Sequence, residues 1–285
     1  MSRFALTRKV AILGIIANIG LLIIKLIVGF MSKSQAMIAD GFNSAGDVFA
    51  STVTFIGNKI SSQPKDHDHP YGHGKAEYIF SMIISFSLFL VAFSIFRSSL
   101  NSILQNKSFE FSVYLVAVAI ITIVLKFFLF LYTHRAGKKE ENLLITANSE
   151  DHRNDIFLTT STLIGIIFGY NGIFWVDGVV GIAISLWIAF TGARIFISCY
   201  KVLMDTDIDK VLKADVVKAI ETTKGVEHID EVKAKPVGIS FIIIVKVSVL
   251  KDLTVEEGHS VAARIKENLK TFKHVSDVIV HINPA

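Results

Sequence analysis

The stretch Met37–Ser51, MIADGFNSAGDVFAS, is apolar enough for a membrane helix, yet it carries polar side chains at Asp40, Asn43 and Asp47. Residues four apart share one face of an α-helix, so Asn43 and Asp47 point the same way, and Asp40 lies one turn before them. A charged side chain inside a span costs about 2.5–3.5 kcal/mol on insertion scales and normally faces an interior cavity or an ion path. The stretch therefore predicts a spanning helix with an oxygen-rich face turned toward other helices.

The composition of the whole chain favours a membrane protein. Of its 285 residues, 52% are hydrophobic and 19% are charged. The mean hydropathy of +0.54 exceeds that of ordinary soluble domains. A segment of about 20 apolar residues can cross a hydrocarbon core of about 30 Å. Six such segments occur, near residues 10–31, 36–57, 78–97, 111–132, 144–169 and 173–200.

The last part of the chain has a different character. Residues 205–285 carry frequent Lys, Glu and Asp, and the strand-like runs FIIIVKVSV and DVIVHI stand between helical stretches. The order helix, strand, strand, helix, strand is typical of a small α+β domain of the split βαβ kind. We therefore predict a membrane all-α domain of six transmembrane helices over residues 1–204, followed by a ferredoxin-like α+β domain over residues 205–285.

Basic residues are unevenly distributed over the connections between the apolar segments. Three basic residues belong to the N-terminal stretch, three flank the loop after the second segment, and three follow the fourth segment, whereas the opposite side has only Lys33, Arg97 and Lys107. Short loops rich in Lys and Arg stay in the cytoplasm. We therefore expect a multi-pass protein of the plasma membrane, with both termini and the second domain in the cytoplasm.

A second polar pair occurs in the fifth segment, in the stretch NSEDHRNDIF, where Asp151 and Asp155 are four residues apart. Together with Asn43 and Asp47, this gives two spans that each present a pair of oxygen ligands on one helix face. A single membrane aspartate can instead hydrogen-bond a neighbouring helix or lie near the headgroups. Two matched pairs favour a cation site over that structural role.

Two lysines in the apolar segments receive a structural interpretation. Lys25 and Lys126 each lie within about six residues of a span end, and over such a distance a lysine can place its ammonium group at the membrane interface. We therefore predict that both side chains snorkel.

Other classes of protein fit the sequence less well. The net charge of +4 comes without a long basic run, so no nucleic-acid partner is expected. The chain has neither a His-Glu-x-x-His nor a Gly-x-Ser-x-Gly motif, which argues against an enzyme. A passive channel remains an alternative, although buried carboxylate pairs suit tight binding better than fast conduction. A membrane metal sensor would use the same ligands without access from both sides.

The paired spans, the loop DHDHPYGHGKAE between the second and third spans, and the α+β domain together resemble the cation diffusion facilitators, which are dimeric metal exporters driven by proton exchange. The resemblance covers nearly the whole chain, and its most specific element is HPYGHGKAE, residues His69–Glu77. It implies a homodimer joined through the cytoplasmic domain, seated in a lipid bilayer. It also implies that the chain holds no cofactor and that its substrates are a divalent metal and protons.

The resemblance places the transport site on Asn43, Asp47, Asp151 and Asp155. Zinc-transporting members have histidine at one or two of these positions. This chain has none, and His152 is expected to point about 100° away from the face of Asp151. An all-oxygen site suits manganese better than zinc, and magnesium dehydrates too reluctantly for a dry site. We therefore expect Mn²⁺ export, with zinc, iron(II), cobalt or cadmium export as the alternative within the family.

The resemblance implies two further features around the loop. Asp66, His69 and His73 form a second candidate metal site, for which the alternative is a hydrated surface turn closed by proline and glycine residues. Lys75 is expected to pair with Asp205 just after the sixth span and to brace the dimer. The alternative for this pair is two unrelated exposed charges.

The resemblance also places regulatory metal ligands in the second domain, at Asp230, His259 and His281. Two further positions of that ligand set are occupied by Val245 and Asn283, which argues against the two-metal cluster of zinc-transporting members. A single-metal site or a dimer interface alone are the remaining alternatives.

The ligand charges suggest a mechanism. Three carboxylates and a divalent ion leave the site near −1, which a low-dielectric span tolerates better than three bare carboxylates. Without metal, mutual repulsion and burial favour protons on these groups, so metal and protons compete for one site. Alternating access would then exchange outgoing metal for incoming protons.

Overall fold

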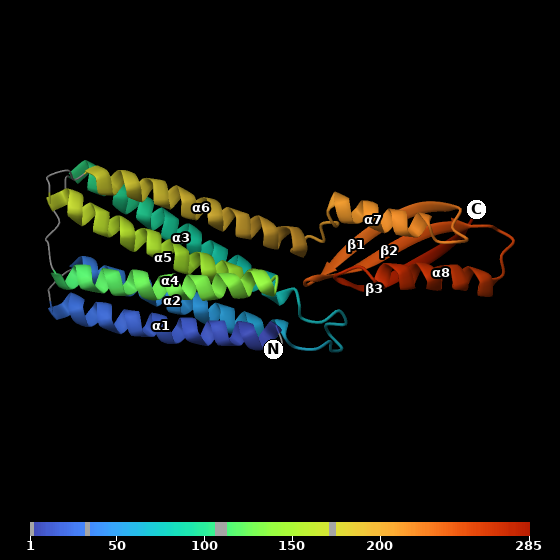
Figure 1. Cartoon of the computed structure of the whole chain (residues 1–285), viewed down its shortest axis with the longest axis horizontal. Coiled ribbons are helices and arrows are strands. Elements are labelled where there is room, and N and C mark those ends of the chain that lie inside the picture. The colour runs from blue at the N-terminus through green and yellow to red at the C-terminus, as the bar shows by residue number, and fades with distance from the viewer. Residues whose placement is uncertain (1–2, 32–34, 106–112, 171–174) are drawn as a thin grey trace. The chain divides into compact units, whose positions relative to one another are not determined.

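A computed structural model describes residues 3–31, 35–105, 113–170 and 175–285 (Figure 1). The side chains of Asp40 and Asn43 lie outside the described residues, although their backbone is part of a helix. The chain divides into two compact units, Met1–Gln63 with Ala76–Cys199, and Pro64–Lys75 with Tyr200–Ala285. The division predicted at residue 204 assigned the loop of residues 64–75 to the membrane domain. In the structure this loop groups with the C-terminal residues instead.

Long helices make up the N-terminal part of the chain. They are α1 (Arg3–Met31), α2 (Gln35–Ser61), α3 (Ala76–Gln105), α4 (Val113–Lys139), α5 (Leu143–Tyr170) and α6 (Trp175–Leu203). Among the described residues, four stretches are long and apolar enough to cross a membrane: Phe4–Val28, Ala76–Asn101, Val116–Lys139 and Gly178–Leu203. These stretches lie in α1, α3, α4 and α6. The two helices left out, α2 and α5, are the ones that carry the predicted aspartates.

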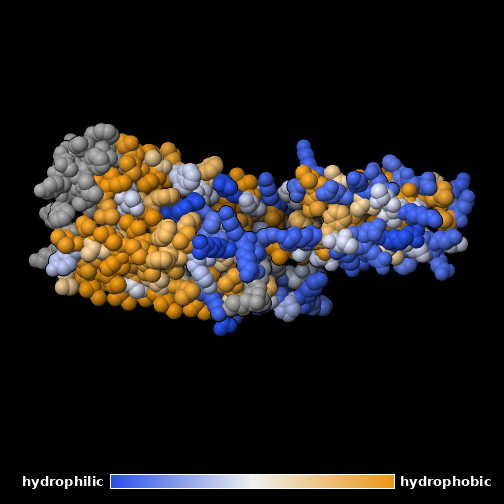
Figure 2. Space-filling model, in the orientation of Figure 1, coloured by the Kyte–Doolittle hydropathy of each residue, from blue (hydrophilic) through white to orange (hydrophobic). Residues whose placement is uncertain are grey.

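The helical unit is apolar outside and polar inside. Its visible surface is mostly hydrophobic (Figure 2), and large apolar side chains such as Leu90 and Phe93 are exposed. Polar side chains such as Asn18, Ser51 and Thr122 are buried between the helices. A water-soluble protein does the reverse, because exposed apolar area is costly in water and a lipid bilayer removes that cost. The distribution therefore supports a multi-pass membrane domain.

The C-terminal residues form a three-stranded sheet with two helices, in the order α7 (Lys210–Glu221), β1 (His228–Val237), β2 (Ser240–Val249), α8 (Val255–Lys270) and β3 (Val275–Pro284). Strands β1 and β2 pair antiparallel as a hairpin, and β2 pairs parallel with β3. The predicted order of elements is confirmed. The predicted split arrangement is wrong, because β2 and β3 are direct neighbours in the order β1-β2-β3. A split unit needs a further strand between these two.

One hydrophobic core joins the sheet to both helices. Alternate residues of β2 enter it, and α7 and α8 contribute Ile220 and Ile265, which are fully buried. Both helices start at well-formed N-caps. The Asp209 carboxylate accepts from two backbone N–H groups of α7, and Thr254 forms a capping box with Glu257 at the start of α8. Such caps contribute about 1 kcal/mol each.

The loop of residues 64–75 contacts the β1–β2 hairpin. Gly238, in the hairpin turn, has φ +67°, and a Cβ added there would lie 3.1 Å from the Cα of Gly74. Glycine at both positions therefore allows the two backbones to touch. Nearby, the ammonium of Lys235 lies 5.0 Å from the centre of the Tyr71 ring, within the range of a cation–π contact.

This contact predicts opposite effects for two glycine substitutions. Gly238→Ala should destabilise the hairpin by about 1–2 kcal/mol or more, because alanine resists the left-handed backbone and its Cβ meets Gly74. Gly258→Ala is the control. Its Cβ would meet only Ile282 Cγ2, at 3.9 Å, and alanine in a helix is favoured over glycine by about 0.5–1 kcal/mol. Amide hydrogen exchange of the full-length protein measures both changes, and undiminished protection of β1 and β2 in Gly238→Ala would contradict this account.

Candidate functional site

Helices α2 and α5 contact each other and place Asp47, Asp151 and Asp155 around one cavity. The cavity has a volume of about 270 Å³, and its other lining residues are mostly apolar side chains of α2, α3, α5 and α6. Asp47 and Asp151 are only 5% and 7% exposed. The described carboxylates of both predicted pairs therefore meet inside the helical unit. The side chain of Asn43, the fourth predicted ligand, lies outside the described residues.

A lysine from a third helix reaches these carboxylates. Lys126 of α4 donates a hydrogen bond to Asp47 Oδ2 at 2.8 Å and another to Asp155 Oδ2, and its side chain is 1% exposed. The prediction that Lys126 snorkels to the membrane interface is therefore wrong. An ammonium group gains more from two buried carboxylates than from headgroups at the end of the helix, because Coulomb attraction is strong at low dielectric.

Lys25 does not snorkel either. Its side chain is buried and donates to Ser44 Oγ at 3.0 Å. For Lys25 the distance to the end of the helix was right, but the inward direction of the side chain was missed. For Lys126 the distance was wrong as well, because α4 extends from Val113 to Lys139 and places Lys126 near its middle.

His152 lies closer to the site than the helical periodicity suggested. It is fully buried, and one of its ring nitrogens lies within 4.8 Å of carboxylate oxygens of Asp151 and Asp155. A rotation of about 100° leads to an adjacent face of the helix, from which an imidazole can still reach back, so this angle does not keep His152 away from the site. A nitrogen donor is therefore available beside the carboxylates.

Several polar atoms of α5 are buried without a hydrogen-bond partner among the described residues. They include Asp151 Oδ2, both ring nitrogens of His152 and the side-chain amides of Asn148 and Asn154. Buried polar atoms in folded proteins are nearly always satisfied by protein, water or an ion. A set of carboxylates, amides and one imidazole fits a divalent cation that keeps part of its water.

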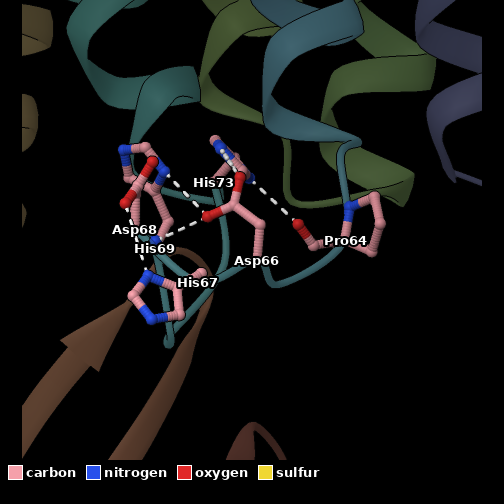
Figure 3. A network of polar contacts seen from close by, with 6 residues as sticks. All are labelled: Pro64, Asp66, His67, Asp68, His69 and His73. Carbon is pink, nitrogen blue, oxygen red and sulfur yellow. Dashed lines mark hydrogen bonds and ion pairs between the residues drawn. The ribbon is translucent and has the colours of Figure 1, made fainter.

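The loop of residues 64–75 forms the second cluster (Figure 3). Ligand atoms of Asp66, His69 and His73 all lie within 4.8 Å of one another. His69 Nδ1 is 3.1 Å from Asp66 Oδ1, and His73 Nε2 is 3.4 Å from Asp66 Oδ2. The neighbouring His67 and Asp68 contact each other at 3.6 Å and are highly exposed. The structure thus brings the three predicted loop residues together.

The loop orients these groups toward one point. His73 Nδ1 is 3.1 Å from the carbonyl oxygen of Pro64. A carbonyl only accepts hydrogen bonds, so a neutral His73 carries its proton on Nδ1, and Nε2, beside Asp66, is the nitrogen through which it could bind a metal. The backbone N–H of His69 donates to Asp66 Oδ1 at 2.6 Å, and this bond lowers the pKa of Asp66. The carboxylate therefore stays ionised at neutral pH, and the stability it contributes is lost only as the pH falls below its usual value of 3.8.

Lys75 and Asp205 are close together within the chain. Lys75 Nζ donates to Asp205 Oδ1 at 2.5 Å, and both side chains are partly exposed. Asp205 follows α6 with φ +52°, a left-handed conformation that aspartate adopts more readily than most residues. The pair implied by the resemblance thus exists, and its role in bracing a dimer stays a prediction.

The predicted regulatory ligands are not brought together in a single chain. Among the described residues, no cluster of metal-ligand atoms includes Asp230, His259 or His281. The Asp230 carboxylate instead accepts from Asn283 Nδ2 at 2.9 Å, a bond that lowers the pKa of Asp230. Val245 is fully buried in the hydrophobic core and offers no ligand atom. A metal site formed by these three residues stays a prediction.

Comparison with known proteins identifies the family. The family model of the cation efflux transmembrane domain matches residues 11–204, and that of the cation efflux protein cytoplasmic domain matches residues 208–285. The chain is 31% identical to the manganese efflux system protein MneP of Bacillus subtilis (strain 168), over 99% of this chain and 97% of that protein. It is 33% identical to MneS, also a manganese efflux system protein of this strain, over 96% and 94% of the two chains. It is 28% identical to the magnetosome protein MamB of Magnetospira sp. (strain QH-2), over 94% and 92%. These matches confirm the resemblance to the cation diffusion facilitators, and the chain belongs to the cation efflux family, whose members are transporters and not enzymes.

Proposed function

We propose that the chain exports manganese(II) across the plasma membrane in exchange for protons, by exposing one site alternately to the two sides. The observation that carries this proposal is the meeting of Asp47, Asp151 and Asp155 at a buried cavity in a cation efflux domain. We assign the fourth ligand to Asn43. Manganese is favoured by the carboxylate-rich ligands and by the names of the similar proteins MneP and MneS.

We further propose that all six long helices cross the bilayer and that both termini lie in the cytoplasm. The helices α2 and α5 are 27 and 28 residues long, enough to span despite their polar side chains. A match to the family's cytoplasmic domain supports this placement of the C-terminal unit and a homodimer formed through it. Under this proposal the basic loops are cytoplasmic, as the positive-inside rule requires.

The coupling to protons follows from charge. Three buried carboxylates without a counter-ion repel each other, so cations of some kind must accompany them in every state. When a metal ion leaves toward the outside, protons can take its place and return inward with the site. The same three carboxylates then carry metal outward and protons inward.

Removal of a single carboxylate tests this site. Asp47→Ala and Asp155→Ala should each lower Mn²⁺ transport in proteoliposomes by more than about tenfold, because each removes a metal ligand. Ser87→Ala is the control, since Ser87 lines the same cavity without a carboxylate and should transport nearly normally. Robust manganese flux in either aspartate variant would refute the site. Metal binding by the wild-type protein without any flux would favour the sensor alternative.

His152 complicates the argument for metal selectivity. The expectation of manganese was built on ligands that offer oxygen only, whereas an imidazole lies within reach of Asp151 and Asp155. A nitrogen donor favours zinc and other borderline metals over manganese. Selectivity for manganese therefore requires that His152 stay out of the coordination shell or contribute only weakly.

Ligand substitution tests this selectivity. Exchange of Asn43 and Asp151 for histidine should shift transport from manganese toward zinc, because two new imidazoles join two aspartates. His152→Gln should leave manganese transport largely intact and reduce any residual zinc transport. Zinc and manganese fluxes are compared in the same vesicles under the same proton gradient. An unchanged preference in the double variant would show that other residues set the selectivity.

We also propose that Asp66, His69 and His73 bind a divalent metal in the loop. Binding of Co²⁺ to purified protein, followed by its visible absorption, should lose one site per chain in His73→Ala, since the imidazole that faces Asp66 is removed. His67→Ala is the matched control, because His67 is exposed and stands apart from the cluster. Equal Co²⁺ stoichiometry in the two variants would rule out the loop site.

A further inference from the structure

We propose that Lys126 is a tethered substitute for the transported ion. Its ammonium group occupies the carboxylates of the transport site when no metal is bound, and an arriving metal has to displace it. The inference rests on the transport site proposed above and adds a competing cation that belongs to the protein itself.

The geometry places the ammonium group on the ligand atoms. Lys126 Nζ binds Oδ2 of both Asp47 and Asp155, so one positive group from α4 bridges α2 and α5. Hard divalent ions bind carboxylate oxygens at about 2.0–2.6 Å. A metal that bridged the same two oxygens would lie where the ammonium nitrogen lies, and the two cations cannot occupy that position together. Metal binding through these atoms therefore requires the lysine to withdraw.

The charges explain why such a substitute is useful. Asp47 and Asp151 are buried and the Asp155 side chain is 12% exposed, and three uncompensated carboxylates are costly at low dielectric. When all three carboxylates are ionised, Lys126 changes the net charge of the cluster from −3 to −2. The ammonium group thus supports the empty state of the site, and the incoming metal exchanges one positive charge for two.

The exchange also limits how tightly the metal is held. Metal can bind only while the lysine is away from the carboxylates. The apparent affinity for metal is therefore the intrinsic affinity multiplied by the fraction of time that the lysine is withdrawn. The same competition helps release, because the ammonium group can return to the carboxylates as the metal leaves. A purely structural lysine would have no such effect, since it would stay in place in both states.

A second buried lysine serves as a comparison. Lys25 is 3% exposed but donates to the neutral Ser44 hydroxyl at 3.0 Å. Its charge also acts on Asp155, but its removal leaves Lys126 bound to the two carboxylate oxygens of Asp47 and Asp155. Lys25→Met therefore separates displacement from a general loss of positive charge.

The experiment measures Mn²⁺ binding to purified full-length protein at fixed pH, by the loss of the electron paramagnetic resonance signal of free Mn²⁺. Every variant also carries His73→Ala, so that the loop cluster does not contribute. We expect Lys126→Met to bind Mn²⁺ about tenfold tighter or more and to release it more slowly during efflux, because the competing cation is gone. Lys25→Met should not tighten Mn²⁺ binding in this way, because its ammonium group acts on Asp155 only through its charge and does not compete for the ligand oxygens.

Lys126→Arg keeps the proposal testable if Lys126→Met does not fold. Arginine retains the charge and can bind a carboxylate through two parallel hydrogen bonds. A metal ion should therefore displace it less easily, and Mn²⁺ binding should weaken several-fold. Affinities of Lys126→Arg and Lys126→Met that match the parent, or tighter binding by the arginine variant, would overturn the proposal. Asp155→Ala separates this failure from failure of the transport site, because full Mn²⁺ binding in that variant would refute the site itself.

Discussion

The constraint on which the rest of the helical unit depends is the burial of negative charge away from water. Asp47, Asp151 and Asp155 line one cavity, and burial of this kind is tolerated only with positive partners. Lys126 supplies one such partner from α4, so three helices are tied together at the site. The polar interior and apolar exterior follow the same logic, because every polar group has to find its partner among the helices.

Much of this arrangement could be predicted from residue spacing. The i, i+4 rule found the aspartate pairs of α2 and α5, since it depends only on the pitch of a helix. The loop cluster was found because its residues are neighbours in sequence. The order of strands and helices in the C-terminal unit also followed from local patterns, whereas the direct pairing of β2 with β3 is a long-range choice that no local pattern fixes.

The errors at the site have a common physical origin. Lys126 and His152 were judged by their own helix, by distance to its end for one and by angle for the other. The actual position of each side chain depends on what a neighbouring helix offers, and the attraction of two carboxylates outweighed the pull of the interface for Lys126. The sequence has a lysine in one spanning segment and three aspartates in two others. This combination of opposite charges was the signal that could have indicated the pairing.

The ion pair between α4 and α5 also bears on how the protein is made. Among the described residues, α5 has no stretch that would cross a membrane by apolarity alone, whereas α4 has one and contacts α5 extensively. A helix that carries Asp155 enters lipid at a lower cost when its charge is already neutralised by Lys126 of the preceding helix. The two helices are joined by a short turn, so we expect them to leave the ribosome and partition into the bilayer as a hairpin. The residue that fills the site in the mature protein would then act earlier, as the counter-ion that lets the most polar segment be inserted during synthesis.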